Sequence, residues 1–373
     1  MGLISMLGNI TIINDQRLFS GISTHIYKIH TNFVSNGLNS EFYQFLIYND
    51  HPPLSTIHVK KGILSFLYSK SKIAYNTKLA LNFMSGYNWR VFKNIAADTV
   101  LLSGPTLLPL VNYYKKTIVI GHDLYFIKNS KENIFLANYM RRLYSLFDKA
   151  DLILVNSNYT MADFIEKLHL KPDKLHVVYP SFEPKDFYPG TSNLKSKLGL
   201  EQNDKIILSV GGDNPNKNIE TIMRALQKLP DNYKLIRVGR NFNTIKLMDD
   251  LGIKKRIISV ENVELEILAD LYRGSDVFVF PSLFEGFGIP LIEAMASGTP
   301  VITSDRGSLP EVVGDAGIIC DPYDINDIAE AVLNLTGEDR IRRSYVSKGL
   351  TRSKLFTPER QFASLSKVLE IKL

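Results

Sequence analysis

The sequence predicts an α/β protein with two parallel sheets. Short apolar runs rich in β-branched residues alternate with amphipathic segments, and this alternation occurs in both halves of the chain. A segment with several prolines and no periodicity lies between the halves. Alternating strands and helices are typical of parallel sheets with helices on both faces. The length of 373 residues also favours two domains.

The individual elements follow the same periodicity. In the first half, strands are expected at residues 9–13, 99–103, 117–121 and 152–156, and a helix at residues 21–36. In the second half, strands are expected at residues 206–210, 234–238, 257–260, 277–280 and 300–303, and a helix at residues 219–229. Residues 179–190 carry three prolines and no periodicity, which predicts the linker there. Two such sets predict two Rossmann-like domains.

The composition limits the class of protein. Hydrophobic residues make up 45% of the chain and charged residues 22%, which is ordinary for a globular protein. Cys320 is the one cysteine, which excludes a disulfide framework and a Cys-based zinc site and favours a reducing compartment. We find no signal peptide and no window near 18 uninterrupted apolar residues. We therefore expect a cytoplasmic protein without a transmembrane helix.

The net charge of +6 belongs to the first half. Residues 1–190 hold 20 Lys and Arg against 13 Asp and Glu, whereas residues 191–373 hold 24 against 25. Residues 59–82 interleave five lysines with apolar and aromatic side chains. Such a basic amphipathic segment is suited to the surface of an anionic membrane, and we expect that partner rather than a nucleic acid. The alternative is an amphipathic helix that faces the core and solvates its lysines.

The most informative stretch is residues 280–298, which read FPSLFEGFGIPLIEAMASG. It places Glu285 and Glu293 eight residues apart, after a strand and around a glycine-containing turn. Pro290 suits the first turn of a helix, and Gly298 suits the position just past its end. A strand that leads through such a turn into a helix commonly presents backbone N–H groups to a phosphate. The amides of Gly286, Phe287, Gly288 and Ile289 are the expected donors.

This stretch resembles the donor-site signature of the family 4 retaining glycosyltransferases, which have the GT-B fold. The resemblance is strong over residues 205–322 and weaker over residues 9–123. It implies two Rossmann-like domains facing each other across a cleft. The implied domains are an acceptor-binding domain at residues 1–185 and a nucleotide-sugar-binding domain at residues 186–357. A helix at residues 358–373 is implied to cross back onto the first domain.

The resemblance assigns roles to residues of the second half. Glu293 is implied to hold the ribose of the donor, and Glu285 to approach the donor sugar. Lys217 follows a strand that ends in Gly211 and Gly212, and its counterpart neutralises the leaving diphosphate. The arginine that accompanies this lysine in the family is missing here. Arg240, in the next strand–helix turn, is our candidate to replace it.

Two residues of the first half match the family in part. Gly21 opens a helix where the family has a glycine-rich loop facing the diphosphate, but only Ser20 precedes it instead of a second glycine. His122, in GHDL, matches a histidine that hydrogen-bonds the donor sugar, and Asp123 is the expected partner of its imidazole. Gly21 as an ordinary helix-start residue and His122 as a buried structural residue are the alternatives. We expect Glu311 to be structural.

The resulting expectation is a retaining, metal-independent transfer of a hexosyl group. The donor would be a nucleoside-diphosphate sugar, and the acceptor a lipid-linked or surface glycan. We expect no cofactor and no metal, because the chain has no D-x-D sequence. The chain also lacks a complete G-x-G-x-x-G, which weakens a dehydrogenase interpretation. The alternatives are a sugar-nucleotide epimerase or phosphorylase of the same fold, or a non-catalytic partner subunit.

Overall fold

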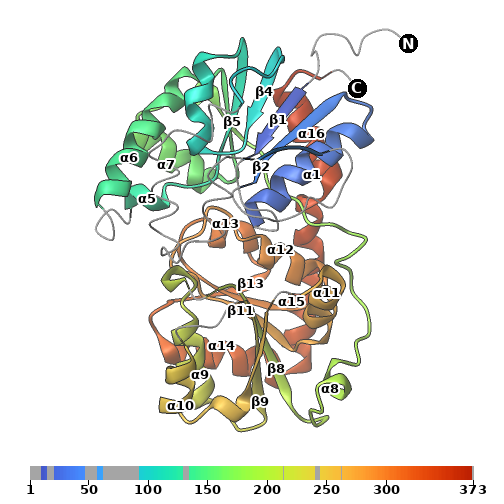
Figure 1. Cartoon of the computed structure of the whole chain (residues 1–373). Coiled ribbons are helices and arrows are strands. Elements are labelled where there is room, and N and C mark those ends of the chain that lie inside the picture. Colours follow the sequence, from blue (N-terminus) through green and yellow to red (C-terminus); the bar gives the residue numbers. More distant parts are fainter. Residues whose placement is uncertain are drawn as a thin grey trace. The chain divides into compact units, whose positions relative to one another are not determined.

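The chain forms two compact units. The computed structural model describes residues 10–14, 21–46, 57–61, 92–128, 134–212, 214–239, 244–261 and 263–371. One unit contains the residues up to Pro180 together with those from Pro358, and the other unit is Ser181–Thr357. Figure 1 shows both units, coloured along the sequence. The change from one unit to the other falls inside the predicted linker segment at residues 179–190.

The first unit is built on a seven-stranded sheet in which every strand pair is parallel. In spatial order the strands are β3 (Ile57–Lys61), β2 (Ser40–Leu46), β1 (Ile10–Asn14), β4 (Thr99–Leu102), β5 (Lys116–Gly121), β6 (Leu152–Val155) and β7 (Leu175–Val177). The chain builds the sheet outward from β1 in both directions. The strand order therefore reverses between β1 and β4.

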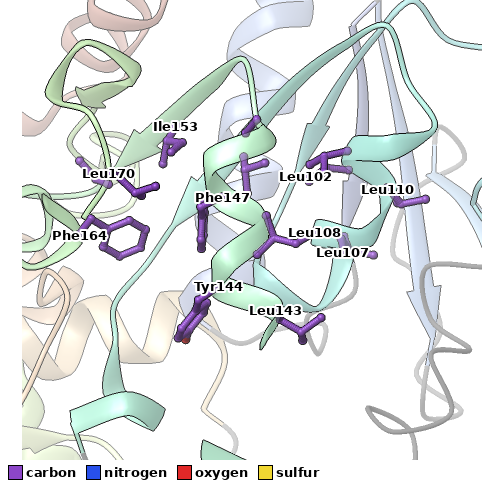
Figure 2. Packing of buried hydrophobic residues seen from close by; sticks show 14 of the residues in the cluster. Leu102, Leu107, Leu108, Leu110, Leu143, Tyr144, Phe147, Ile153, Phe164 and Leu170 are labelled. Atoms are coloured by element: carbon purple, nitrogen blue, oxygen red, sulfur yellow. The ribbon is translucent and has the colours of Figure 1, made fainter. Parts of the chain in front are cut away.

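Helices cover both faces of this sheet (Figure 1). They are α1 (Gly21–Ser35), α5 (Tyr125–Lys128), α6 (Ile134–Tyr144), α7 (Asn158–Leu168) and α16 (Pro358–Val368), with 3-10 turns η1 (Pro105–Asn112), η2 (Ser145–Lys149) and η3 (Pro172–Lys174). On the α6 and α7 side, Phe147 packs edge-on against Phe164 in a fully buried cluster (Figure 2). On the other side, α1 and α16 pack together and enclose a second cluster with the strands.

The helix α16 completes the first unit although it follows the second unit in the chain. Phe362 and Leu365 of α16 are buried in one cluster with Ile26 of α1. Gln361, which is 2% exposed, accepts a hydrogen bond from Asn32 Nδ2 at 3.0 Å. Its amide nitrogen donates to the backbone oxygen of Tyr179 at 3.1 Å. Apolar burial and a buried amide network therefore hold α16 on α1.

The second unit repeats the architecture with a six-stranded parallel sheet. In spatial order the strands are β10 (Ile257–Val260), β9 (Tyr233–Val238), β8 (Lys205–Val210), β11 (Val277–Phe280), β12 (Val301–Ser304) and β13 (Gly317–Cys320). The strand order reverses between β8 and β11. Open parallel sheets bind ligands at such a reversal, beyond the carboxyl ends of the strands.

The helices of the second unit also lie on two faces of its sheet (Figure 1). They are α8 (Leu194–Lys197), α9 (Ile219–Lys228), α10 (Ile245–Asp250), α11 (Leu265–Gly274), α12 (Ile289–Ala296), α13 (Leu309–Val313), α14 (Ile325–Gly337) and α15 (Asp339–Ser353), with turns η4 (Pro215–Lys217), η5 (Lys254–Arg256) and η6 (Lys354–Phe356). A cluster of apolar residues from α9, α10 and α14 covers one face. The two parallel-sheet, Rossmann-like halves confirm the predicted α/β fold class.

The predicted strands are present, and their ends shift by one residue at most. The predicted strand at residues 9–13 is β1, and that at residues 300–303 is β12. Sequence reasoning did not predict β2, β3, β7 or β13. Residues 59–61 of the basic segment belong to β3, so the segment starts as a strand; its residues 62–82 lie outside the described residues. Among the helices that the structure describes, none is long and apolar enough to cross a membrane.

Candidate functional site

The site residues of the second unit gather where its strand order reverses. β8 is followed by Gly211, Gly212 and the turn η4, which contains Lys217. β11, the neighbour of β8, is followed by the loop that contains Glu285. Because the strands are parallel, both loops leave the same edge of the sheet. Residues distant in sequence are thereby brought to one place.

Lys217 and Glu285 form an ion pair at this edge. Lys217 Nζ lies 2.5 Å from Glu285 Oε1, and the two side chains are 22% and 15% exposed. The ammonium also lies 5.1 Å from the centre of the Phe280 ring, at the end of β11. An ammonium and a carboxylate that are partly shielded from water interact more strongly than an exposed pair. The pair is therefore a fixed polar feature above the reversal.

Asn216 and Asn218 fasten the lysine loop to the glutamate loop. Leu283 N–H donates to Asn216 O at 2.7 Å. Asn218 adopts a left-handed conformation with φ 54°, which asparagine tolerates better than most residues. Its side-chain amide donates to Pro281 O at 3.2 Å and to Pro322 O at 2.7 Å. These bonds fix the position of Lys217, the residue between the two asparagines.

The turn before α13 supports the backbone of Glu285. Ser308 Oγ donates to Glu285 O at 3.1 Å or to Phe287 O at 3.0 Å. Gly307 has φ 61°, and a Cβ placed there would lie 2.6 Å from Glu285 O. Only glycine fits so close to this carbonyl in that conformation. Sequence reasoning did not single out Gly307, and its place in the segment SDRGSLPE was the available signal.

The glycines and proline around α12 lie where the sequence predicts them. Gly288 caps the helix with φ 103°, and a Cβ there would meet Leu309 Cδ2 at 2.8 Å. Pro290 lies in the first turn. Past the helix end, Gly298 N–H donates to Met295 O and Thr299 N–H donates to Ala294 O, which is the hydrogen-bond pattern of a Schellman motif.

The backbone from Gly286 to Ile289 leads from Glu285 into the start of α12. Gly286 and Gly288 are buried, and Ile289 is half-buried. Phe287 is 4% exposed, and its ring packs edge-on against Phe356 with the ring centres 5.5 Å apart. This packing anchors the loop at the amino end of the helix, where the helix dipole favours an anion.

Glu293 lies on α12 and faces α11. The hydroxyl of Tyr272, which is fully buried in α11, donates to Glu293 Oε2 at 3.2 Å. Burial and the Glu293 charge raise the pKa of Tyr272 well above its ordinary value, so the hydroxyl keeps its proton. Tyr272 therefore orients the carboxylate. Sequence reasoning missed this tyrosine because nothing in its local pattern distinguishes it from a core residue.

The glycines near Lys217 differ in how tightly their surroundings constrain them. Gly212 follows β8, and a Cβ there would meet nothing within 4 Å. Gly239, after β9, is the constrained position: it has φ 132°, and a Cβ there would lie 2.3 Å from Gly211 O. This close approach of two strand ends was not predicted. Arg240, the predicted replacement for the missing arginine, lies outside the described residues.

In the first unit, His122 follows β5 in a buried polar cluster. The imidazole Nε2 donates to Ser103 O at 2.7 Å, and Asn156 Nδ2 donates to His122 O at 2.9 Å. The His25 ring from α1 approaches edge-on, with the ring centres 6.4 Å apart. Burial lowers the pKa of His122 to about 4, although the bond to Ser103 raises it. Burial lowers the pKa of His25 to about 3, and repulsion from the protonated form of His122 and from Lys28 acts in the same direction. Both histidines are therefore neutral at pH 7.

Asp123 and Gly21 each lie at or just before the start of a helix. The Asp123 carboxylate accepts a hydrogen bond from Tyr125 N–H at 2.9 Å, in the turn that leads into α5, whereas the bond recorded for the His122 imidazole goes to Ser103. Gly21 is the first residue of α1, and the loop at residues 15–20 lies outside the described residues. Glu311 accepts a bond from Arg352 Nη2 through its backbone oxygen.

No group of three or more His, Cys, Asp or Glu side chains in the described parts of the chain could hold a metal ion. The charged groups that the structure describes at the reversal include the Lys217 ammonium and the Glu285 carboxylate, close to the amino end of α12. This set is suited to an uncharged polyhydroxyl group joined to a phosphate, since carboxylates accept hydrogen bonds from hydroxyls and the ammonium binds anionic oxygens.

Comparison with known proteins agrees with this geometry. Residues 191–351 match the family model described as "Glycosyl transferases group 1". The D-inositol 3-phosphate glycosyltransferase of Mycobacterium sp. (strain KMS) is 31% identical over 218 residues, which are 55% of this chain and 50% of that protein. The O-antigen chain mannosyltransferase B of Escherichia coli is 33% identical over 237 residues, 59% of this chain and 61% of that protein. The chain thus spans about half or somewhat more of the length of these relatives.

Solved structures extend the likeness to the whole fold. The sucrose-phosphate synthase of Thermosynechococcus elongatus superposes with a TM-score of 0.83 at 20% identity, over 97% of this chain and 98% of that chain. Its coverage includes both Rossmann-like units, although the family model covers only the second. The chain therefore has the GT-B fold, and its second unit carries the match to glycosyl transferases group 1.

Proposed function

We propose that the protein is a retaining glycosyltransferase that uses a nucleoside-diphosphate sugar. The observation that carries this proposal is the Lys217–Glu285 pair at the reversal between β8 and β11. A cation and an acid lie together beside the amino end of α12. A sugar joined to a diphosphate needs both kinds of group within a few ångströms of each other.

In the proposed reaction, Lys217 stabilises the departing diphosphate. The bond between the anomeric carbon and the diphosphate oxygen breaks, and negative charge grows on that oxygen. In the structure the ammonium is paired with Glu285; with the donor bound it would turn to the diphosphate, assisted by the helix dipole of α12. Glu285 is then available to the hydroxyls of the sugar.

The acceptor hydroxyl completes the exchange on the same face of the sugar. Its oxygen bonds to the anomeric carbon on the side that the diphosphate leaves, and its proton passes to a diphosphate oxygen. The configuration at that carbon is thereby retained. No metal is needed in this scheme, because Lys217 and the amino end of α12 stabilise the negative charge of the departing diphosphate. Glu293, oriented by Tyr272, would bind the ribose of the donor.

The remaining assignments concern the first unit and stay predictions. His122 is proposed to contact the donor sugar as a neutral hydrogen-bonding group, and Gly21 to face the diphosphate. The acceptor is proposed to be a lipid-linked or surface glycan, in line with the O-antigen mannosyltransferase among the relatives. A cytoplasmic location with contact to an anionic membrane through residues 59–82 belongs to the same proposal.

A thermal-shift series tests the donor site without knowledge of the acceptor. The purified chain is melted with UDP, GDP, ADP and CMP and with their sugar conjugates, first without metal and then with magnesium. A ligand that binds only the native state at about 100 times its Kd adds about 2.7 kcal/mol of stability. We expect one nucleoside diphosphate to raise the melting temperature without metal.

A matched pair of variants assigns the shift to this site. Lys217→Ala should remove the shift, and Lys228→Ala, on an exposed turn of α9, should keep it. The sugar conjugate of the same base is then supplied, and its products are followed by proton NMR. An epimerised free sugar nucleotide, or a reaction that requires inorganic phosphate, would refute transfer. Absence of any shift would refute the donor site.

A further inference from the structure

A polar pocket lies at the edge of the second sheet opposite to the Lys217–Glu285 pair. Its volume is about 480 Å3. Its walls come from the segment that begins α8, from the end of α11 with the first residues leading into β11, and from α15. Asp276, which lines it, directly precedes β11, whereas Glu285 follows that strand. In Figure 1, α8 accordingly lies at the other end of the unit from α13.

The charged side chains of this pocket are mainly cationic. Lys195, Arg273 and Arg342 line it together with one acid, Asp276. The Asp276 carboxylate is already engaged by β8, since Oδ2 accepts a hydrogen bond from Ile206 N–H at 2.8 Å and Oδ1 lies 3.8 Å from the Lys205 ammonium. A second acid, Asp270, accepts a hydrogen bond from Ser192 and lies near Arg273, but it is paired with Lys197 at 2.8 Å. The pocket lining therefore retains an excess of positive charge.

Arg342 is the unusual member of the set. Its Nε is buried and has no hydrogen-bond partner, and the structure gives its guanidinium no ion pair with any described residue. A buried donor without an acceptor is destabilising. Arg343, the next residue on α15, is exposed to water and incurs no such cost. Because Nε is closed to solvent, an anion in the pocket would bind the terminal Nη atoms of Arg342 rather than Nε.

Arg273 is held in place before any ligand arrives. Its Nη1 donates to Asp186 O at 3.3 Å, and its guanidinium stacks on the Tyr188 ring at 5.0 Å. Gly274 brings the end of α11 against α8, because a Cβ there would lie 2.5 Å from Leu194 Cβ and 2.8 Å from Ser192 Oγ. The pocket thus has fixed walls and one preplaced guanidinium.

We propose that this pocket binds a small phosphate-bearing anion. The guanidinium groups of Arg342 and Arg273 would donate to the phosphate oxygens, since the planar fork of donors matches phosphate geometry. Lys195, whose ammonium donates to Gln202 O at 3.0 Å, adds to the positive potential. This site uses no residue of the Lys217 loop, so it is independent of the proposed transferase activity. The phosphate is either free or the ester group of a small metabolite.

The test is calorimetric titration of the whole chain with inorganic phosphate and with glycerol 3-phosphate. Sodium chloride of equal ionic strength is the reference. We expect saturable binding to the unchanged protein and to Lys217→Ala. Arg342→Gln should weaken binding about ten- to a hundredfold, because a charge-assisted hydrogen bond contributes about 1.5–3 kcal/mol. Arg343→Gln, the matched control on the same helix, should bind as the unchanged protein does.

The two ligands distinguish the source of the phosphate. Tighter binding of glycerol 3-phosphate indicates an ester, and equal binding indicates free phosphate. Heats no larger than those of sodium chloride, or equal binding by Arg342→Gln, would overturn the proposal. If the glutamine variant does not fold, Arg342→Lys replaces it in the test, since lysine keeps the positive charge but lacks the planar array of guanidinium donors. Undiminished phosphate binding by that variant would count equally against the assignment.

Discussion

Lys217 Nζ lies 2.5 Å from Glu285 Oε1, although 68 positions separate the two residues in the sequence. The contact exists because β8 and β11 are neighbours in the sheet and their loops leave it at the same edge. It joins the two loops that the proposed chemistry requires. Substitution of Lys217 and substitution of Glu285 should nevertheless have different effects on ligand binding and turnover.

Lys217→Gln and Glu285→Gln should separate binding from turnover. We expect Lys217→Gln to weaken nucleoside-diphosphate binding and to lower the transfer rate about 10²- to 10³-fold, because it removes charge that faces the leaving group. Glu285→Gln should bind the nucleoside diphosphate as tightly as the unchanged protein and still lose turnover. Calorimetry and donor consumption measure the two effects. Equal loss of diphosphate affinity in both variants would contradict the separate roles.

Tyr272→Phe tests whether the buried hydroxyl positions Glu293. Loss of the 3.2 Å bond should weaken binding of the nucleoside diphosphate about tenfold and lower the free energy of unfolding by about 1 kcal/mol. The 2′,3′-dideoxy form of the same ligand cannot use the carboxylate. Its affinity should therefore be the same in both proteins. An equal loss for both ligands would show that Tyr272 acts only through general stability.

Gly307→Ala should damage the site more than glycine replacement elsewhere. Gly307 and Gly199 both have positive φ, at 61° and 64°, but only Gly307 faces a carbonyl at 2.6 Å. Alanine at position 199 should cost about 1 kcal/mol from backbone strain. Alanine at position 307 should cost more and also weaken diphosphate binding. Urea unfolding and calorimetry measure both, and equal costs for the two variants would refute the close approach.

The neutral histidines His25 and His122 predict acid sensitivity. Their pKa values are lowered from 6.5 to about 3 and about 4, so the unfolded chain binds protons first as the pH falls. The stabilisation is then complete above about pH 6.5; the His122 contribution is lost between pH 6.5 and about 4, and the His25 contribution between pH 6.5 and about 3. For His122 alone the loss is on the order of 3 kcal/mol. His122→Asn should flatten the dependence of the urea midpoint on pH in that window.

His169→Asn is the control for this experiment. His169 is exposed and has φ 55°, a conformation that asparagine tolerates. Its replacement should leave the slope unchanged. A slope that His122→Asn does not alter would show that burial of this imidazole does not govern acid stability.

Gln361→Leu should loosen α16 from the first unit. The change removes the bonds that Gln361 makes with Asn32 Nδ2 and Tyr179 O, both in buried or half-buried surroundings. Asn32 Nδ2 keeps its weaker bond to Pro358 O at 3.4 Å. We expect a loss of about 2–4 kcal/mol in the free energy of unfolding. Gln227→Leu, on the exposed side of α9, should cost less than about 1 kcal/mol. Hydrogen exchange of α16 amides should rise in the first variant alone.

Local patterns were sufficient to predict most of the fold. The β-branched runs identified β1, β8 and β11 because buried parallel strands are continuously apolar. Glycine and proline marked both ends of α12, since each has a backbone preference that operates within a few residues. Those ends predicted that Glu285 lies in the loop before the helix and that Glu293 lies on the helix. β13 was missed because its sequence GIIC holds only two β-branched residues, whereas IISV of β10, an edge strand of the same length, holds three.

Relationships between distant segments were not predictable in the same way. The pairing of Lys217 with Glu285 depends on which strands are neighbours, which one sequence does not reveal. Tyr272 reaches Glu293 only through the packing of α11 on α12, and Gly239 is constrained by the backbone of Gly211 rather than by its own turn. These contacts are made by tertiary structure, so their residues have no local signature.

The position of α16 imposes an order on synthesis. This helix supplies Phe362 and Leu365 to the core of the first unit, yet it is translated only after all of Ser181–Thr357. The core of the first unit therefore stays incomplete during translation, with the apolar face of α1 uncovered. The second unit is continuous in sequence and can fold as it emerges. Nascent chains released before Pro358 should accordingly expose that face and recruit chaperones that bind apolar segments.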